Sequence, residues 1–499
     1  MPIEQRGVDT IPDEERTSGP RDLISILLGS NLALGVVIFG WLPVSFGLGF
    51  WPSVTSLVAG TAVGTLLTAP LALVSLRSAT NLSTSSGAHF GVRGRLIGSV
   101  IGLLLSLGYT ALTLWVGGDA VVGCLHRLIG LPAGGPTYAL VYALLAGATA
   151  VGAVYGYRVL LRLSKVLAVG LTILLALGIV AYAGTFTTAA PHGTSYLLGG
   201  FWQTWLLAAV SAGLSGPIAF ITLLGDYSRY ISPRRHSSKK VFGAACLGLV
   251  VGLLIPQLFG TFTALAVGAG GDYAGPLVAG APFWYLALLL LNASAGSVGN
   301  AGLMLYSMGL DLDAILPRAT RTQATYVVAA VSTVLVFGGH FLWAAQDAMT
   351  SFVLLMTAVG TPWAVITVIG FVRCRGRYDA DALQVYNRGT RGGVYWYRAG
   401  WNAHAALAWA LGSAVGLMGV DTPFYQGPLL PLTGGIDVSF LLAAAVAGLA
   451  YLALGARDPR PVTAVRPAAP ASAPSCAETP TTPTTAPAGP PAEAAAEAG

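Results

Sequence analysis

Long apolar segments follow one another along the chain. Ten stretches contain no Asp, Glu, Lys or Arg, and each approaches or exceeds the roughly 20 residues that a membrane-crossing helix needs. These stretches are residues 23–76, 96–118, 128–157, 166–225, 241–271, 273–310, 322–346, 348–372, 399–420 and 438–456. They are too long and too uniformly apolar for β-barrel strands, which alternate polar and apolar positions over about ten residues. The pattern predicts an all-α polytopic membrane protein.

The two longest stretches each have room for two crossings, with Gly- and Pro-marked turns near 46–51 and 190–200. Twelve transmembrane helices are therefore expected. Their approximate bounds are 23–46, 52–76, 96–125, 137–156, 164–186, 201–224, 240–268, 282–308, 324–341, 347–372, 400–419 and 437–456.

The charges support this count. The chain is 55% hydrophobic and only 9% charged, whereas soluble proteins carry about 25% charged residues, so a water-soluble fold is excluded. If the N-terminus is cytoplasmic and there are twelve crossings, 25 of the 26 Lys and Arg residues fall inside and only Arg127 falls outside. An excess of Lys and Arg is typical of the cytoplasmic loops of membrane proteins. Both termini are thus expected to be cytoplasmic, and the net charge of +6 indicates topology and no nucleic-acid partner.

Two Gly-rich interruptions divide the chain further. Helix 1 carries Gly35, Gly40 and Pro43, and helix 6 carries the run from Ser211 to Pro217. Their separation by five helices predicts two inverted repeats with a ligand held between the breaks, although small residues also serve close helix packing. The expected parts are an N-tail (1–20), a first repeat (21–186), a second repeat (201–372), a basic cytoplasmic loop (373–399), two extra C-terminal helices (400–456) and a disordered Pro/Ala/Thr-rich tail (457–499).

Metal and catalytic motifs are missing from the sequence. The four cysteines have no CxxC spacing and the six histidines are scattered, so neither a metal site nor a disulfide framework is expected. There is no HExxH, GxSxG or phosphate loop. The sequence predicts a protein that is not an enzyme and has no catalytic residues or cofactor. The paired breaks favour an occluding carrier over a passive channel, and no obligate protein partner is predicted.

Polar residues inside the apolar segments mark a candidate pathway, because such groups are costly in a membrane. Helix 3 offers Tyr109 and Thr113 on one face, and helix 8 offers Asn292 and Asn300. An aromatic ring beside amide and hydroxyl groups suits a flat heteroaromatic ligand. Hydrogen bonding between helices is the alternative role for these residues.

Four ordered motifs resemble one family. Residues 225–233 read Gly-Asp-Tyr-Ser-Arg-Tyr-Ile-Ser-Pro, which is similar to the end of helix 6 in the nucleobase cation symporter 1 family, in its purine-cytosine permease branch. The other three agreeing stretches are 108–118 (Gly-Tyr-Thr followed by Trp-Val-Gly-Gly), 306–310 (Tyr-Ser-Met-Gly-Leu) and 393–402 (Gly-Val-Tyr-Trp-Tyr to Gly-Trp-Asn). The resemblance runs from about residue 8 to about residue 455.

The resemblance implies a secondary active transporter with the fold of the sodium-coupled amino-acid transporters plus two helices. It implies inward transport of a cytosine, purine or similar heterocycle with a cation, across the cytoplasmic membrane of a bacterium with a GC-rich genome, to judge from the abundant Ala, Gly and Arg. Allantoin, a hydantoin, thiamine and pyridoxine are the alternative substrates. The family's ring-binding positions fall on Gly35, Tyr109, Thr113, Ser215, Gly216, Pro217 and Asn300.

The coupling ion is expected to be either Na⁺ or H⁺. A sodium site in this fold would use carbonyls around Ala33 and Val36 with helix 8 hydroxyls of Ser294 and Ser297. Ala295 stands where sodium-coupled relatives have Thr, which leaves proton coupling open, with Asp119 as the first acidic candidate.

A structural carboxylate that faces Arg127 is the alternative role for Asp119. Asp226 and Arg229 are expected to be structural or part of an inner gate. The resemblance further predicts alternating access, in which helices 1, 2, 6 and 7 rock against helices 3, 4, 8 and 9.

Overall fold

The computed structural model describes residues 7–191, 193–316, 321–342 and 345–455. Helices and turns make up these residues, and β-structure among them is limited to isolated bridges. The tail at 457–499, for which disorder is expected, lies outside the described residues.

The helices alternate between long spans and short pieces. The α-helices are α1 (Pro20–Asn31), α2 (Leu34–Ser45), α3 (Phe50–Thr68), α4 (Leu71–Ser78), α5 (Leu82–Phe90), α6 (Leu96–Ile129), α7 (Gly135–Tyr155), α8 (Tyr157–Tyr182), α9 (Phe201–Ala208), α10 (Ser215–Ile218), α11 (Leu224–Ser228), α12 (Ser238–Val267), α13 (Ala274–Gly280), α14 (Phe283–Leu291), α15 (Ser297–Ile315), α16 (Arg321–Leu342), α17 (Ala345–Arg373), α18 (Ala380–Leu383), α19 (Ala403–Met418) and α20 (Ser439–Ala453). The 3₁₀ turns are η1 (Asp13–Glu15), η2 (Ala183–Thr185) and η5 (Leu430–Thr433), and the π-turns are η3 (Ala209–Leu214) and η4 (Asn292–Gly296).

Seven helical runs among the described residues are long and apolar enough to cross a membrane. They are Phe50–Ser78, Leu96–Ile129, Gly135–Tyr155, Tyr157–Thr185, Ser238–Val267, Phe283–Ile315 and Asp347–Arg373. The pair α1 and α2 qualifies as an eighth span that bends by 65° at its break. Three shorter apolar helices occupy Gln323–Gly338, Ala403–Met418 and Ser439–Ala453. The chain is thus an all-helical, multi-pass membrane protein, as its apolar pattern predicts.

Exposed aliphatic side chains cover the outward faces of these helices. Leu66 of α3, Val166 of α8 and Val334 of α16 are each about 70% exposed. A protein in water would bury such surfaces, whereas hydrocarbon solvates them. Aromatic residues such as Trp41 and Trp363 are fully buried between the helices.

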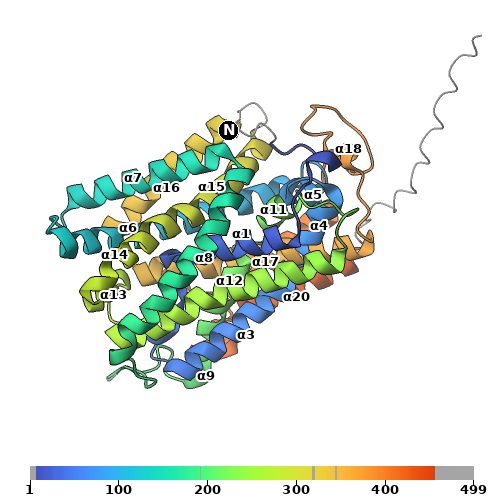
Figure 1. Cartoon of the computed structure of the whole chain (residues 1–499). Helices are drawn as coiled ribbons and strands as arrows, with labels where there is room; N and C mark the ends of the chain where they lie inside the picture. Colours follow the sequence, from blue (N-terminus) through green and yellow to red (C-terminus); the bar gives the residue numbers. More distant parts are fainter. Residues whose placement is uncertain (1–6, 192, 317–320, 343–344, 456–499) are drawn as a thin grey trace, which may run out of the picture. The chain divides into compact units, whose positions relative to one another are not determined.

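Two groups of helices form the centre of the bundle. In one, α1 to α4 pack against α12 and against the segment from η3 to α11; in the other, α6, α7, α15 and α16 pack on one another. Figure 1 shows the second group along the upper side of the view, and α3 and α12 along the lower side. Helix α2 contacts α6, so the two groups meet along these helices.

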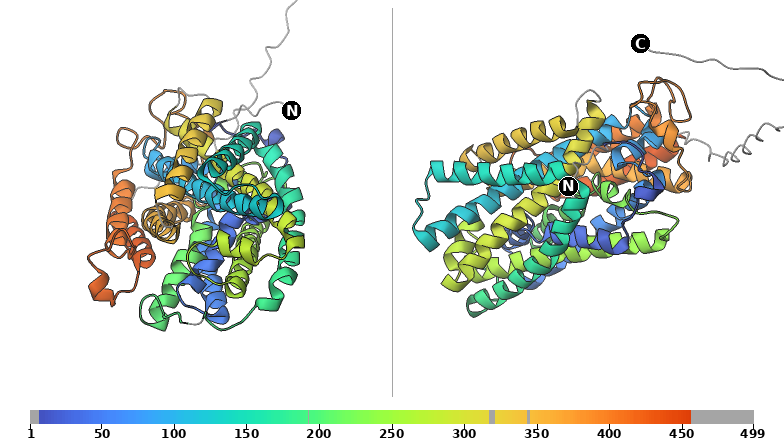
Figure 2. Two further views of the ribbon diagram at one scale, coloured as in Figure 1. Left: turned by 90° about the vertical axis from the view of Figure 1, so that its left-hand side faces the viewer. Right: turned by 45° about the horizontal axis from the view of Figure 1, so that its top comes forward.

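The last helices lie at the edge of the bundle. Helices α19 and α20 pack on each other and on α17, and the left view of Figure 2 shows these orange segments at the periphery. The basic loop is folded: Leu383 of α18 and Tyr395 pack on Ala88 of α5. Its arginines lie on the surface.

Candidate functional site

Helix 1 is interrupted just before the Gly-rich stretch in which the sequence predicts a break, and Gly35, Gly40 and Pro43 themselves lie inside α2. Helix α1 ends at Asn31 and α2 begins at Leu34, so Leu32 and Ala33 leave the helical path. The Ala33 carbonyl accepts from the backbone N–H groups of Val36 and Val37, at 2.9 and 3.1 Å, and so starts α2. An unwound stretch survives at membrane depth only where protein surrounds it or it lines a cavity. Both residues are fully buried.

Helix 6 is irregular over a longer stretch than its glycines suggest. The π-turn η3 covers residues 209–214, the short helix α10 includes Gly216 and Pro217, and residues 219–223 form turns. Side chains from other helices bind its carbonyls: Thr61 Oγ1 donates to Gly213 at 3.1 Å, Gln257 Nε2 donates to Ala212 at 3.1 Å, and Thr68 Oγ1 donates to Pro217 at 3.1 Å. These bonds supply partners that a regular helix would provide internally.

Two asparagines in the segment from η4 to α15 contact the break between α1 and α2. The π-turn η4 begins at Asn292, whose Nδ2 lies 3.5 Å from the Leu32 carbonyl. Asn300, in α15, donates through Nδ2 to the Ser30 carbonyl at 2.8 Å and accepts through Oδ1 from Thr113 Oγ1 at 2.9 Å. The Asn300 amide therefore joins helices 1, 3 and 8 at one point.

A small cavity lies at this junction. Tyr109 of α6 borders it; its hydroxyl donates to the Ser215 carbonyl at 3.0 Å, and its ring lies 6.0 Å from the ring of Phe39. The free space for a water-sized sphere is about 20 Å³, which is room for about one water molecule. The lining residues are Asn31, Gly35, Val36, Phe39, Tyr109, Thr113, Gly216, Ala219, Phe220, Leu253, Asn300 and Met304.

The structure brings most of the predicted ring-binding residues together. Gly35, Tyr109, Thr113, Gly216 and Asn300 line the small cavity. Ser215 flanks it, because its carbonyl accepts from Tyr109, whereas the Pro217 carbonyl accepts from Thr68 of α3, which does not line the cavity. Five further lining residues carry no role predicted from the sequence: Asn31, Phe39, Phe220, Leu253 and Met304. Asn31 could have been recognised from the sequence, because it is an amide beside the break. The other four residues are apolar and look like ordinary residues of membrane helices.

The predicted cation ligands do not all meet. Val36 lines the small cavity, and Ala33 lies against Gly296, whose added Cβ would be 3.2 Å from the Ala33 Cα. Ser297 Oγ donates to the Thr113 carbonyl at 3.3 Å. Ser294 is half-buried, and its hydroxyl donates to the Leu290 carbonyl of its own helix at 2.8 Å. The hydroxyl expected from Ser294 is therefore not directed to the break.

The candidate acidic residues have different surroundings. Asp119 accepts a hydrogen bond from the Tyr142 hydroxyl of α7. The guanidinium of Arg127 donates to the carbonyls of Val278 and Ala281, at 2.5 and 2.8 Å. Asp226, 2% exposed, accepts from the Leu82 N–H at 3.4 Å.

The N-terminal segment crosses the C-terminal end of helix 6. Arg16, only 5% exposed, donates to the carbonyls of Leu76, Arg229 and Ile231 at 2.6, 2.9 and 2.5 Å. Burial lowers the pKa of Arg16 to about 10, so the group stays charged at neutral pH. Arg229 in turn donates to the Gly7 carbonyl at 2.8 Å. These bonds hold the ends of helices 2 and 6 together.

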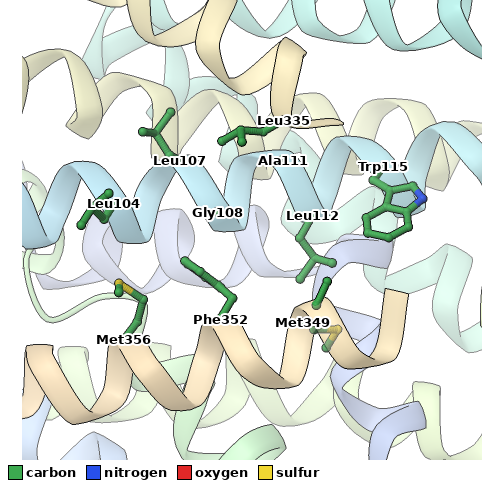
Figure 3. Close-up of a pocket in the computed structure, with 11 residues that line it drawn as sticks. Leu104, Leu107, Gly108, Ala111, Leu112, Trp115, Leu335, Met349, Phe352 and Met356 are labelled. Carbon is green, nitrogen blue, oxygen red and sulfur yellow. The ribbon is translucent and has the colours of Figure 1, made fainter. Parts of the chain in front are cut away.

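A larger cavity lies between α6, α16 and α17 and is almost wholly apolar (Figure 3). Its free space for a water-sized sphere is about 300 Å³. Phe352 points from α17 toward Gly108, where an added Cβ would overlap the phenyl ring. The Phe352 ring also meets Tyr109 edge-on, with centroids 5.5 Å apart. Two aromatic rings thus lie between the large apolar cavity and the small one, which is also mostly apolar but borders the polar groups of Asn31, Tyr109, Thr113 and Asn300.

Known proteins agree with this architecture. A family model described as permease for cytosine/purines, uracil, thiamine, allantoin matches residues 10–443. The Bacillus subtilis protein YxlA, whose name places it among purine-cytosine permeases, is 24% identical over 471 residues, which cover 91% of this chain and 96% of that protein. The purine-cytosine permease FcyB of Emericella nidulans is 23% identical over 483 residues, covering 91% and 88%.

A solved structure shows the same fold. Mhp1, a nucleobase-cation-symport-1 family transporter in a closed conformation with bromovinylhydantoin bound, matches with a TM-score of 0.71 at 19% identity. The match covers 90% of this chain and 94% of that one. The motifs, the broken helices and the family model thus agree: the chain belongs to the nucleobase cation symporter 1 family and is a transporter of nucleobases or related heterocycles.

Proposed function

We propose that this protein imports a nucleobase, cytosine or a purine, together with a cation by alternating access. The arrangement of Tyr109, Thr113 and Asn300 carries this proposal. A ring can stack on Tyr109, while the Asn300 amide offers both a donor and an acceptor to a heterocycle edge. These side chains now bind one another and nearby carbonyls. A ligand would take over those bonds.

The size of the small cavity requires movement. Ligand sites for compounds of drug size enclose about 300–1,000 Å³, far more than the 20 Å³ present here. We infer that the helices around α2, η3 and α12 rock against α6 and α15 to open the site to one side at a time. The two helix groups meet at the small cavity, which suits such a motion.

We propose twelve crossings in two inverted repeats, 21–186 and 201–372, followed by two further helices in 400–456. The three shorter apolar helices and the irregular α9–α11 segment would complete the number beyond the long spans. Both termini would face the cytoplasm of a bacterium, with the protein in its cytoplasmic membrane, because that orientation places nearly every Lys and Arg inside. Fusions of a reporter enzyme after helices 10, 11 and 12 test the side of each connection.

The coupling ion is proposed as either H⁺ or Na⁺. Hard cations need several oxygen ligands. Near the break the structure offers the Leu32 carbonyl and the Oδ1 of Asn292, a buried acceptor without a hydrogen-bond partner. Ser294 supplies no hydroxyl there. This incomplete set of ligands favours the proton.

Uptake of radiolabelled cytosine, adenine, hypoxanthine, uracil and allantoin in cells lacking their own permeases tests the proposal. Wild type is compared with Asn300→Ala, with and without sodium and with a protonophore. We expect saturable uptake of one nucleobase that the variant loses. Uptake of allantoin alone would favour the alternative substrate class of allantoin, hydantoins and vitamins. No uptake of any of the five would contradict the nucleobase assignment.

A further inference from the structure

Two buried carboxylates contact neighbouring residues at the start of α5, in the cytoplasmic half of the bundle. Asp226 of α11 and Asp311 of α15 are each 2% exposed, and the charge of Asp226 acts on Asp311. The start of α5 holds both: the Leu82 N–H lies 3.4 Å from Asp226 Oδ1, and Ser83 Oγ donates to Asp311 Oδ1 at 2.6 Å. Two neighbouring carboxylates buried among membrane helices cannot both stay ionised without a large free-energy penalty.

One cation acts on this pair from helix 6. Arg229 acts electrostatically on Asp226. Its guanidinium also donates to the Gly7 carbonyl at 2.8 Å and to the Tyr306 hydroxyl at 3.0 Å. The positive charge of Arg229 therefore favours an ionised Asp226.

The other neighbours leave Asp311 without a counter-charge. Tyr227, whose phenol lies 3.3 Å from Ser307 Oγ, is influenced by both carboxylates and is neutral. Farther along α15, Asp313 interacts with Arg95, the residue before α6, whose guanidinium also donates to Thr84. The interactions found for Asp311 among the described residues include no cation. Asp311 is therefore the member that carries a proton.

A row of hydroxyls leads from the small cavity to this pair. Thr110 and Ser106 follow Thr113 at helical spacing along α6, and both are buried with no hydrogen-bond partner. Thr222, 1% exposed, also has no partner. A Cβ added at Gly102 would overlap Asp311 Oδ2 and lie 3.0 Å from Thr222 Oγ1, so the Thr222 hydroxyl points into the same space as that carboxylate.

Unpartnered hydroxyls at membrane depth are costly unless water or a ligand reaches them during the working cycle. Water in an open state would connect Thr113, Ser106 and Thr222 to Asp311. That route lets a proton pass between the ligand site and the carboxylates by hydrogen-bond exchange, with one proton gained by a carboxylate for each proton lost by water.

We propose that Asp226 and Asp311 form the proton-binding site that couples transport in this protein. The inference rests on the proposed transport function and goes further by naming the ion and its ligands. Asp226 belongs to the helix group of α4 and α11, and Asp311 to the group of α6 and α15. A proton on Asp311 removes the repulsion between the two carboxylates, and so between the cytoplasmic ends of the two groups. Its release to the cytoplasm leaves two like charges, whose repulsion favours opening to the inside.

The coupling can be tested with full-length protein reconstituted in proteoliposomes. The substrate is the compound that the five-compound uptake experiment identifies, and radiolabelled cytosine is tried first. An imposed pH gradient should drive accumulation in wild type. Asp311→Asn should lower this accumulation by about tenfold or more, while exchange of internal for external ring, which needs no net proton movement, stays within about threefold of wild type. Asp226→Asn should behave alike. Asp437→Asn, which alters a buried carboxylate in the turn before α20, is the matched control and should accumulate normally.

Full pH-driven accumulation by Asp311→Asn, or accumulation that follows a sodium gradient alone, would overturn the proposal and leave the transport function intact. Loss of both accumulation and exchange would indicate a folding defect. In that case Asp311→Glu, which keeps the acid, should restore accumulation if the proton site is real.

A second measurement needs no substrate. The infrared C=O stretch of a protonated carboxyl group, followed as the pH around the reconstituted protein is raised, should show a titrating band that Asp311→Asn lacks and Asp437→Asn keeps. If the band titrates but none of the five rings is transported, the proton site stands and the substrate proposal fails. If no band depends on Asp311, the proton site fails whatever is transported.

Discussion

The two cavities that border α6 differ in size and chemistry, and the smaller one is the candidate site. The larger, between α6, α16 and α17, has about 300 Å³ of free space and apolar walls. The smaller has about 20 Å³, yet it is bordered by Tyr109, Thr113 and Asn300 and lies where two helices break. In an occluding transporter the ligand site closes in part of the cycle, so free volume alone does not identify it. The polar side chains that converge on the smaller cavity identify it as the candidate site.

The wall between the cavities is made of aromatic rings. Phe352 lines the larger cavity, and Tyr109 lines the smaller one. Their edge-on contact contributes about 0.5–1.5 kcal/mol beyond simple burial. Substitutions in the smaller cavity should therefore reduce transport most, substitutions in the aromatic wall should reduce it less, and substitutions in the larger cavity should reduce it least.

Asn300→Ala should have the largest effect. It removes the amide that binds Thr113 and the Ser30 carbonyl, and each buried group left unpaired costs about 1–3 kcal/mol. Uptake of the transported ring should fall by at least about tenfold. The matched change in the apolar cavity, Leu335→Ala, should leave uptake nearly unchanged. Equal losses in both variants would contradict the assignment of the site to the small cavity.

Gly35→Ala should close the small cavity. The added Cβ would lie 2.5 Å from Thr113 Oγ1 and 2.7 Å from the Thr113 Cα, and a backbone atom cannot move aside as a side chain can. Overpacking of this kind costs about 1–3 kcal/mol, and both uptake and melting temperature should fall. Gly147→Ala, where nothing lies within 4 Å of the added atom, serves as control. Normal uptake by Gly35→Ala would show that α2 and α6 need not touch.

Phe352→Ala should weaken the wall. Loss of the edge-on contact with Tyr109, worth about 0.5–1.5 kcal/mol, should reduce apparent affinity by about two- to tenfold. The opened wall should also let rings with bulky apolar substituents compete for uptake. Phe352→Leu keeps bulk without the ring and separates the two effects. If competition by substituted rings is unchanged, the wall does not set the size limit.

Met356→Ala, in the apolar cavity, should have the smallest effect on transport. The side chain lines that cavity and is only half-buried, so its loss enlarges existing free space. We expect uptake within about twofold of wild type and at most a modest drop in melting temperature, since burial at this site is incomplete. A severe loss of uptake would place the large cavity in the transport path.

The sequence predicted the class, the family and the existence of a break in helix 1, which the structure places at Leu32 and Ala33, before the glycines. Tyr109 and Thr113 fall on one face because four residues make about one turn of helix. Ser294 shows where such spacing fails. It lies within the π-turn η4, and the altered turn changes which residues face the break. The proximity of Asp226 and Asp311 could not be predicted from the sequence either, because Asp311 belongs to no motif that we recognised.

The sequence by itself determined that the chain crosses a membrane many times as helices. Each crossing must satisfy its own backbone hydrogen bonds in hydrocarbon, so the requirement is written locally in long apolar runs. Only the tertiary structure decided which polar groups meet. Thr113 and Asn300 are 187 residues apart, and Leu82 and Asp226 are 144 apart. Such pairs form when helices pack, and packing depends on shape complementarity between whole helix faces, which no local pattern contains.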